Sequence, residues 1–426
     1  MAALPPTGSA ALTSDGKPAD EFKKRVSGFV NTGINQHALL AFASEARGGR
    51  LCTLSADVSV CKRNVIRTIR FNDGVKWVAR LRIPSWPGSL QSRACSDKVT
   101  ADMRSELATM EFLRRKTDIP IPEVYAYNLD TPNPVGCPFI IAQHVHASTA
   151  EHMSKAYPGH HEGVPPRYQH KFFKQLAGIM VKLASVRLPK IGSITRTEGS
   201  KDRFVIGPLV ETGTGPYDSA VDFYRDYPRA LHKKLAQEAD PVSGQREVLQ
   251  AFQALASTFT HQATTTCGKR PDEGFGLANY NLGLENILVD SDFNVLAVTD
   301  WSSVASMPDA ALHRLPFLMG VDCLVPGLAE PHHAALERQQ LAQQLAETAE
   351  MVSQLHCANS RQASRGKKTS FQFNRRAFFC KEALAHRAMV YVQLRQGRVN
   401  REWLKGLKWM LKHSDADVKH FYLLVD

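Results

Sequence analysis

Short runs of alternating or continuous apolar residues in the first third of the chain predict β-strands. The predicted strands are 51–60, 65–71, 76–83, 124–127 and 139–145. Asn72-Asp73-Gly74 supplies a hairpin turn between the second and third strands. Helical periodicity covers 21–47, which Gly48-Gly49 ends, and 97–115, which the Ile-Pro pairs of 119–122 end. These elements predict a small lobe that ends near Val145.

The remainder of the chain carries mostly helical periodicity. The predicted helices are 168–186, 223–239, 246–263, 332–356 and 375–396, and one hairpin turn is predicted at 291–294. Residues 1–20 are rich in Ala, Pro, Gly, Ser and Thr and predict a disordered leader. We therefore expect an α+β protein with two lobes. The first is a small mixed-sheet lobe over 21–145, and the second is a mostly helical lobe over 146–426 with a loop at 279–301.

Composition adds limits on the partners of the protein. The 426 residues are 43% hydrophobic and 22% charged, which is ordinary for a soluble globular protein. The net charge of +12 is spread along the chain; it suits anionic ligands such as nucleotides, or simply raises solubility. Without zinc-finger spacing or an RNA-binding aromatic signature, we expect no nucleic-acid partner. The scattered cysteines and the lack of a long apolar stretch predict a cytoplasmic protein without membrane association, and the oligomeric state stays open.

The segment from Asn279 to Trp301 has the outline of a phosphoryl-transfer loop. Such a loop carries a catalytic Asp five residues before a metal-binding Asn, and a second metal-binding Asp follows a short hairpin. Asn286 and Asp300 occupy the positions of the two metal ligands. The position of the catalytic base holds Asn281, whose neutral amide can hold a hydroxyl group but cannot accept its proton at neutral pH.

The third predicted strand and the helix that follows it carry a candidate ion pair. Alternation along the strand places Arg80 and Arg82 on one face. Glu106 falls inside an apolar stripe of the helix, formed by Val99, Met103, Met110 and Leu113. A carboxylate at a packed interface is costly unless it is paired, so we predict that Glu106 pairs with Arg80. The alternative is an edge strand with solvated arginines and a partly exposed Glu106.

Taken together, these elements resemble the aminoglycoside phosphotransferase and choline kinase-like family, in particular its divergent fungal members. The resemblance runs from about residue 57 to residue 308 and rests on the order and spacing of the segments 77–80, 105–110, 119–122, 134–139, 282–290 and 300–301. It implies a bilobal, protein kinase-like fold, the cofactors ATP and magnesium, and a small-molecule acceptor.

The resemblance also implies a role for individual residues. It places Arg80 near the phosphates with Glu106 supporting it, and it places magnesium on Asn286 and Asp300. The nucleotide base would be held by the connector 141–145, where Gln143 and Val145 are the candidate contacts.

The turn between the first two strands departs from the family pattern. The family has glycine and small residues there, whereas this chain reads Val60-Cys61-Lys62-Arg63-Asn64. Without glycine, backbone amides approach phosphates less closely. Lys62 and Arg63 either compensate with their charge or occupy the phosphate position themselves, and a polar turn without a ligand is the simpler alternative.

The sequence leaves two functions open. The first is phosphotransfer from ATP to a small-molecule hydroxyl, weak or lost because general-base loss costs roughly two to four orders of magnitude in rate. The second is a pseudokinase that binds a nucleotide, a metabolite or a protein without transfer. The segments expected to face the acceptor, 158–167 and 317–333, contain few acidic residues, so an aminoglycoside is not the expected acceptor.

Overall fold

The computed structural model describes residues 19–61, 63–83, 92–159, 163–197, 203–236, 250, 253, 274–313, 332–363, 371–380, 382–383 and 386. The chain divides into two compact units. The first unit comprises 1–104 and 121–146, and the second comprises 105–120 and 147–426. Residues 1–18 of the predicted leader, and most of the predicted helices at 246–263 and 375–396, lie outside the described residues.

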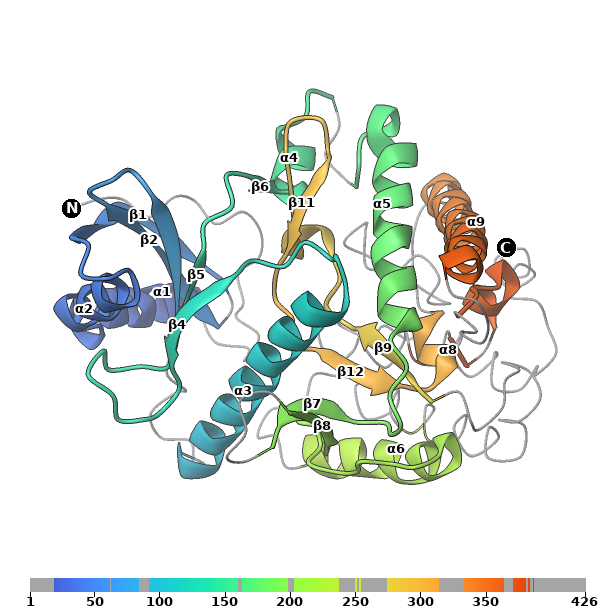
Figure 1. The fold of residues 1–426 in the computed structure, drawn as a ribbon, viewed down its shortest axis with the longest axis horizontal. Coiled ribbons are helices and arrows are strands. Elements are labelled where there is room, and N and C mark those ends of the chain that lie inside the picture. The colour runs from blue at the N-terminus through green and yellow to red at the C-terminus, as the bar shows by residue number, and fades with distance from the viewer. Residues whose placement is uncertain are drawn as a thin grey trace. The chain divides into compact units, whose positions relative to one another are not determined.

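An antiparallel five-stranded sheet with the strand order β1-β2-β3-β5-β4 forms the frame of the first unit (Figure 1). Its strands are β1 (Cys52–Val60), β2 (Asn64–Phe71), β3 (Lys76–Arg82), β4 (Val124–Asn128) and β5 (Phe139–Gln143). The predicted turn forms between β2 and β3, where the Asp73 side chain accepts from the Val75 N–H at 3.2 Å. Gly74 has a φ of 83°, a conformation that favours glycine.

The predicted helix at 21–47 is not continuous. It consists of α1 (Ala19–Gly28), the π-helical turn η1 (Phe29–Gly33) and α2 (Gln36–Ala46). The Asn35 side chain accepts a hydrogen bond from the Ala38 N–H at 3.1 Å and so caps the start of α2. The prediction of one helix was wrong because this cap begins a second helix inside a stretch whose apolar period looks uninterrupted.

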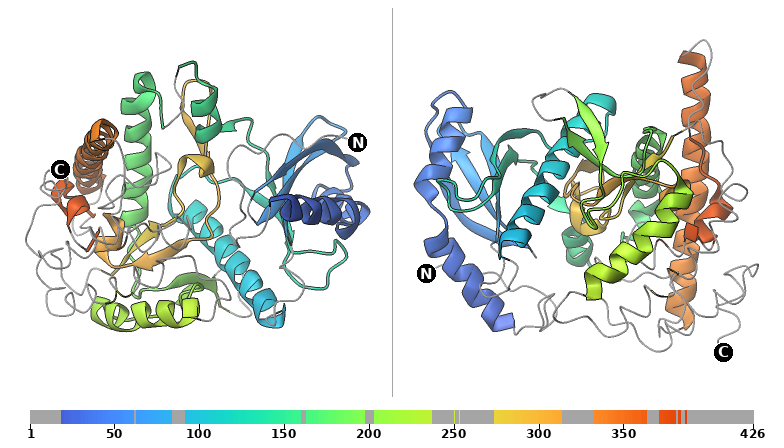
Figure 2. Two further views of the ribbon diagram at one scale, coloured as in Figure 1. Left: turned by 180° about the vertical axis from the view of Figure 1, so that it is seen from behind. Right: turned by 90° about the horizontal axis from the view of Figure 1, so that it is seen from below.

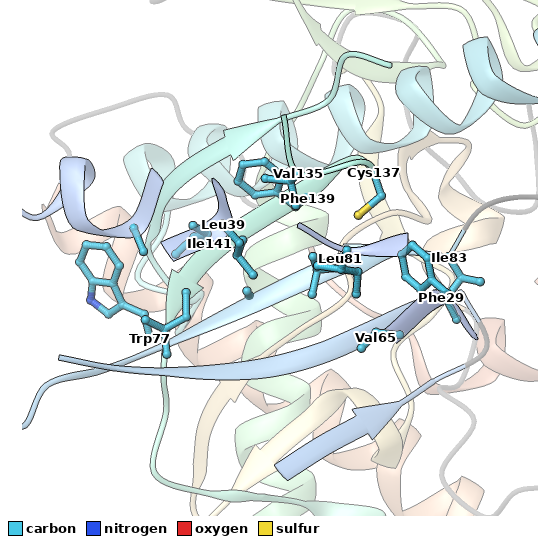
Figure 3. Close-up of a cluster of buried hydrophobic side chains, with 14 of the residues drawn as sticks. Phe29, Leu39, Val65, Trp77, Leu81, Ile83, Val135, Cys137, Phe139 and Ile141 are labelled. Atoms are coloured by element: carbon cyan, nitrogen blue, oxygen red, sulfur yellow. The ribbon is translucent and has the colours of Figure 1, made fainter. Parts of the chain in front are cut away.

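The core of the first unit lies between the sheet and α2 (Figure 3). Leu39 of α2 is fully buried, as are Leu81 of β3 and Phe139 of β5. Phe42 adds a ring contact to Phe139, with 5.2 Å between the centroids. Because side chains alternate along a strand, burying Leu81 in this core puts Arg80 on the opposite face of the sheet.

Helix α3 (Ser92–Lys116) begins in the first unit, and its residues from Ser105 onward belong to the second. The other helices of the second unit are α4 (Ala150–Ala156), α5 (Pro166–Ser185), α6 (Ala220–Ala236), α8 (Asp309–Leu312) and α9 (His332–Ala363), with the 3-10 turns η3 (Leu284–Asn286) and η4 (Arg375–Phe379). Helices α5 and α9 pack side by side in both Figure 1 and Figure 2. No helix within the described ranges is long and apolar enough to cross a membrane.

The second unit also contains short strands. They are β6 (Ser148–Thr149), β7 (Ser193–Arg196), β8 (Phe204–Gly207), β9 (Gly276–Asn279), β10 (Ile287–Val289), β11 (Val295–Val298) and β12 (Val304–Met307). They pair as β11-β10-β6, β12-β9 and β7-β8. The β10–β11 hairpin contains the turn predicted at 291–294, whereas the other strands are too short for an apolar period to reveal. The α+β fold class is confirmed, with more strand in the second unit than the sequence predicts.

Candidate functional site

The β10–β11 hairpin is closed by one carboxylate. Asp290 accepts from the backbone N–H groups of Asp292 and Asn294, each at 2.9 Å, and from the Asn294 side-chain amide at 2.8 Å. These donors, led by the Asn294 side chain, hold the pKa of Asp290 below its ordinary value of 3.8. Donors within five residues therefore satisfy the Asp290 carboxylate.

The same hairpin is anchored to α5. Phe293 is fully buried at a φ of 56°, and its ring stacks on Tyr168 with 5.1 Å between the centroids. The Gln175 side-chain oxygen accepts from the Val295 N–H at 2.9 Å. A bulky residue tolerates the left-handed backbone region only where packing compensates, so these contacts fix the position of the strand that leads to Asp300.

Side-chain amides cross-link the loop between β9 and β10. The Asn279 side-chain oxygen accepts from the Asn281 N–H at 2.9 Å, and the Asn286 amide nitrogen donates to the Asn281 carbonyl at 2.9 Å. The Asn286 carbonyl in turn accepts from the Thr299 N–H at 2.8 Å. These bonds hold the backbone of Asn281 on both sides and tie the loop to the end of β11.

Asp300 lies at the centre of this arrangement. Its Oδ2 accepts from the Asn281 side-chain nitrogen at 2.6 Å, and its Oδ1 accepts from the Ser302 hydroxyl at 2.6 Å. Its φ of 55° puts a residue other than glycine in the left-handed region, where aspartate is among the better tolerated residues. Asn281, Asn286 and Asp300, predicted from their spacing, are thus in one hydrogen-bonded group.

Glu106 joins the group from α3. Its side chain is 2% exposed, as its place in the apolar stripe predicts, and its Oε1 accepts from the Trp301 N–H at 3.3 Å. Trp301 is 1% exposed and donates from its indole N–H to the Val298 carbonyl at 2.8 Å. Glu106 therefore holds the residue that directly follows Asp300. Since Arg80 belongs to the first unit and Glu106 to the second, their predicted ion pair stays a prediction.

The remaining predicted site residues belong to the first unit, and their roles stay predictions. Arg80 is half-buried on β3, in register with Ile66 of β2 and Ile140 of β5. Gln143 is exposed at the end of β5, where its N–H donates to the Glu123 carbonyl at 2.7 Å, and Val145 is half-buried two residues later.

The turn between β1 and β2 is closed by its own backbone. The Cys61 N–H donates to the Asn64 carbonyl at 2.9 Å, and the Asn64 N–H donates to the Cys61 carbonyl at 3.4 Å. Arg63 is exposed, and its carbonyl accepts from the Ile83 N–H at 2.9 Å, whereas Lys62 lies outside the described residues. Two amides of the turn are thus engaged in holding the turn itself.

Sequence reasoning missed two residues that position the group. Ser302 was not predicted as a contact of Asp300, although a serine two residues after an aspartate is a familiar local hydrogen-bond pattern. Gln175 lies 120 residues before its partner Val295, so no local pattern could have revealed it. Among the described residues, no cluster of three or more His, Cys, Asp or Glu side chains could hold a metal ion.

No family model matches the chain. Over part of its length it is similar to curated fungal proteins. It is 29% identical over 120 residues to a subtelomeric hrmA-associated cluster protein from Aspergillus fumigatus, which covers 25% of this chain and 21% of that protein. It is 29% identical over 175 residues to the altered inheritance of mitochondria protein 9 from Candida tropicalis, covering 37% of this chain and 27% of that protein. The chain thus spans only about a quarter of the length of these relatives.

In structure, the chain resembles known phosphotransferases. Macrolide 2'-phosphotransferase type I is 15% identical with a TM-score of 0.45, covering 88% of this chain and 97% of that one. A putative fructosamine-3-kinase from Thermobifida fusca is 12% identical with a TM-score of 0.45, covering 88% and 99%. A ternary complex of aminoglycoside phosphotransferase APH(4)-Ia with ADP and hygromycin B is 16% identical with a TM-score of 0.42, covering 90% and 98%.

Proposed function

We propose that this protein is a divergent, cytoplasmic, kinase-like phosphotransferase that binds ATP with magnesium and transfers phosphate slowly to a small-molecule hydroxyl. The observation that carries the proposal is the 2.6 Å hydrogen bond between Asn281 and Asp300. This bond joins Asn281, which has the sequence position of the catalytic base, to Asp300, which has the sequence position of a metal ligand.

The donors of this group fit magnesium, which prefers hard oxygen ligands and keeps several waters. Asp300 would supply a carboxylate oxygen. Asn286 would supply its amide oxygen, because its amide nitrogen donates to the Asn281 carbonyl. When bound, magnesium would neutralise charge on the phosphates of the nucleotide.

The amide of Asn281 sets the expected rate. It can orient an acceptor hydroxyl by a hydrogen bond, but it cannot take the proton that leaves during transfer. Loss of general-base catalysis costs roughly two to four orders of magnitude, while positioning and charge neutralisation stay in place. We therefore expect slow transfer by a site that keeps its other parts.

The nucleotide is assigned to residues of the first unit as part of the same proposal. Arg80 would contact the phosphates, Arg63 would contribute charge at the turn, and Gln143 with Val145 would contact the base. The acceptor remains a small hydroxylated compound, whose identity these residues do not determine.

A pseudokinase is the second candidate, and a specific observation favours it. The backbone N–H groups of Cys61 and Asn64 donate within their own turn, so this turn has fewer amides to offer a phosphate. A site that binds nucleotide through side chains alone would hold it without the contacts that align it for transfer.

The deciding experiment pairs a titration with an assay. Binding of ATP is measured with and without magnesium, and product formation is then followed on a panel of hydroxylated metabolites. We expect Asn281→Asp to raise transfer by about 100-fold or more, because it restores the proton acceptor. Asn294→Asp is the matched control, since Asn294 also donates to an aspartate but lies in the hairpin turn.

Each outcome has a distinct meaning. Transfer by wild type that exceeds transfer by Asn281→Asp would show that residue 281 is not at the base position. Nucleotide binding without turnover by either protein would favour the pseudokinase. Failure of both proteins to bind nucleotide would reject the phosphotransferase and would leave only a pseudokinase whose ligand is a metabolite or a protein.

A further inference from the structure

We infer that the side-chain amide of Asn281 competes with a divalent cation for the Asp300 carboxylate. This competition weakens the binding of a divalent metal at the site. This inference rests on the proposed role of Asp300 as a metal ligand. The Asn281 amide donates to the Asp300 carboxylate oxygen that would bind a cation. Metal binding therefore requires that this hydrogen bond be broken.

The orientation of the amide follows from the short contact. The side chains of Asn281 and Asp300 meet at 2.6 Å. If the amide oxygen faced the carboxylate, two partial negative charges would meet at that distance with no proton between them. The amide nitrogen therefore faces Asp300, and its N–H groups present the positive end of the amide dipole to the position of a cation.

The second carboxylate oxygen is also engaged. Ser302 donates from its hydroxyl to Oδ1 at 2.6 Å, and its backbone N–H approaches the same oxygen at 3.4 Å. Charge-assisted hydrogen bonds of this kind are stronger than neutral ones and offset part of the charge that would attract a metal. Each oxygen keeps lone pairs, so the serine leaves room for a cation, whereas the amide dipole of Asn281 opposes one.

The backbone keeps Asn281 in this place. Its N–H donates to the Asn279 side chain at 2.9 Å and its carbonyl accepts from Asn286 at 2.9 Å, so the side chain cannot leave by a shift of the loop alone. A rotation of the amide by half a turn would bring its oxygen toward Asp300. That state is favourable only with a cation between the two oxygens. The Asn281 amide thus has two orientations. In one its nitrogen donates to Asp300, and in the other its oxygen faces Asp300 and a metal ion is required between them.

The test measures binding of Mn²⁺ alone, by the loss of its free signal in electron paramagnetic resonance, with no nucleotide present. We expect Asn281→Ala to bind Mn²⁺ about 10-fold more tightly than wild type, because the competing donor is gone. Asn281→Asp should bind more tightly still, because it replaces the donor with a second carboxylate. Asn294→Ala is the control that removes an amide from Asp290 and should leave Mn²⁺ affinity unchanged.

A second measurement, the unfolding temperature with and without Mn²⁺, tests the inference in variants that fold poorly. Without metal, Asn281→Asp should unfold at a lower temperature than wild type, because two carboxylates face each other. Added Mn²⁺ should raise its unfolding temperature more than that of wild type. A larger rise than in wild type identifies the cause as carboxylate repulsion at a metal site, since a general folding defect would leave the metal-induced rise no larger than that of wild type.

Three results would overturn the inference. Weaker Mn²⁺ binding by Asn281→Ala than by wild type would show that Asn281 rotates and serves as a ligand. Equal binding by the two would show that the amide does not compete. Tight Mn²⁺ binding by Asn281→Asp that persists when Asp300→Ala is added would remove the metal role of Asp300 itself, and with it the metal part of the proposed function. Failure of nucleotide binding, by contrast, would leave the Mn²⁺ comparison intact.

Discussion

Two asparagine–aspartate pairs in the second unit share one kind of hydrogen bond and differ in what surrounds it. Asn294 and Asp290 are four residues apart, and their bond of 2.8 Å lies inside a turn whose backbone amides donate to the same carboxylate. Asn281 and Asp300 are 19 residues apart, and their bond of 2.6 Å joins two segments that the fold brings together. The Asn294–Asp290 bond is a local contact within the hairpin turn, whereas the Asn281–Asp300 bond depends on tertiary structure.

The surroundings of the long-range pair explain why it needs support. Asp300 adopts a left-handed backbone conformation, which is unfavourable for residues other than glycine, although less so for aspartate than for most. Glu106 bonds the next residue, Trp301, and Ser302 bonds the Asp300 carboxylate. The Asp290 carboxylate, by contrast, accepts from two backbone N–H groups of its own turn. The Asp300 arrangement thus depends on contacts from α3 and from its own loop, whereas the Asp290 carboxylate is held by donors of its own turn.

The largest expected effect is a difference between Asp300 and Asp290 in their importance for binding magnesium–ATP. Asp300→Ala should weaken binding of magnesium–ATP by about 100-fold or more, because it removes the only charged candidate ligand of the proposed site. Asp290→Ala should leave that binding unchanged. Isothermal titration of both variants measures the difference. Equal losses in the two would show that the pairs do not differ in role.

The next effect tests the support from α3. Glu106→Ala should lower the free energy of unfolding by about 2 kcal/mol, because it leaves the buried Trp301 N–H without this acceptor. Glu106→Gln keeps an acceptor and should lose about half as much. Glu111→Ala on the same helix is the control, with an expected loss below about 1 kcal/mol, since its ion pairs are partly exposed. Urea unfolding gives all three values, and a loss in Glu106→Ala no larger than the control would contradict the prediction.

A smaller effect tests the second donor to Asp300. Ser302→Ala should lower the free energy of unfolding by about 1 kcal/mol, because Oδ1 loses its hydroxyl donor. The neighbouring Ser303→Ala provides the comparison on the same loop. If thermal unfolding shows the two variants to be equally stable, the Ser302 hydroxyl contributes nothing measurable to the Asp300 arrangement.

The smallest effect concerns the local pair and depends on pH. The pKa of Asp290 lies below 3.8, chiefly because Asn294 donates to it. Its ionised form is therefore favoured in the folded state, and this stabilisation is present above pH 3.8 and disappears as the pH falls through the lowered pKa. Unfolding of wild type and Asn294→Ala between pH 6 and pH 2 measures it: the variant should be slightly less stable near neutrality and should lose less stability in acid. Parallel curves would show that Asn294 does not lower this pKa.

The sequence by itself determined much of the first unit and the location of the loop. The strands near 65–71 and 76–82, the turn at Gly74 and the burial of Glu106 all follow from periods of two or 3.6 residues. The positions of Asn281, Asn286 and Asp300 follow from motif spacing. Each of these signals lies within a short stretch of chain, where the backbone geometry ties residue spacing directly to side-chain direction.

Only the tertiary structure decided what the loop residues contact. The sequence predicted Asn281 as a replaced base, and the fold added that its amide donates to Asp300. It likewise gave Glu106 the Trp301 N–H as a partner and brought Gln175 of α5 to the hairpin. These contacts join residues 19, 195 and 120 positions apart. No local period encodes such pairs, because they form only when packing of separate elements fixes the distance between them.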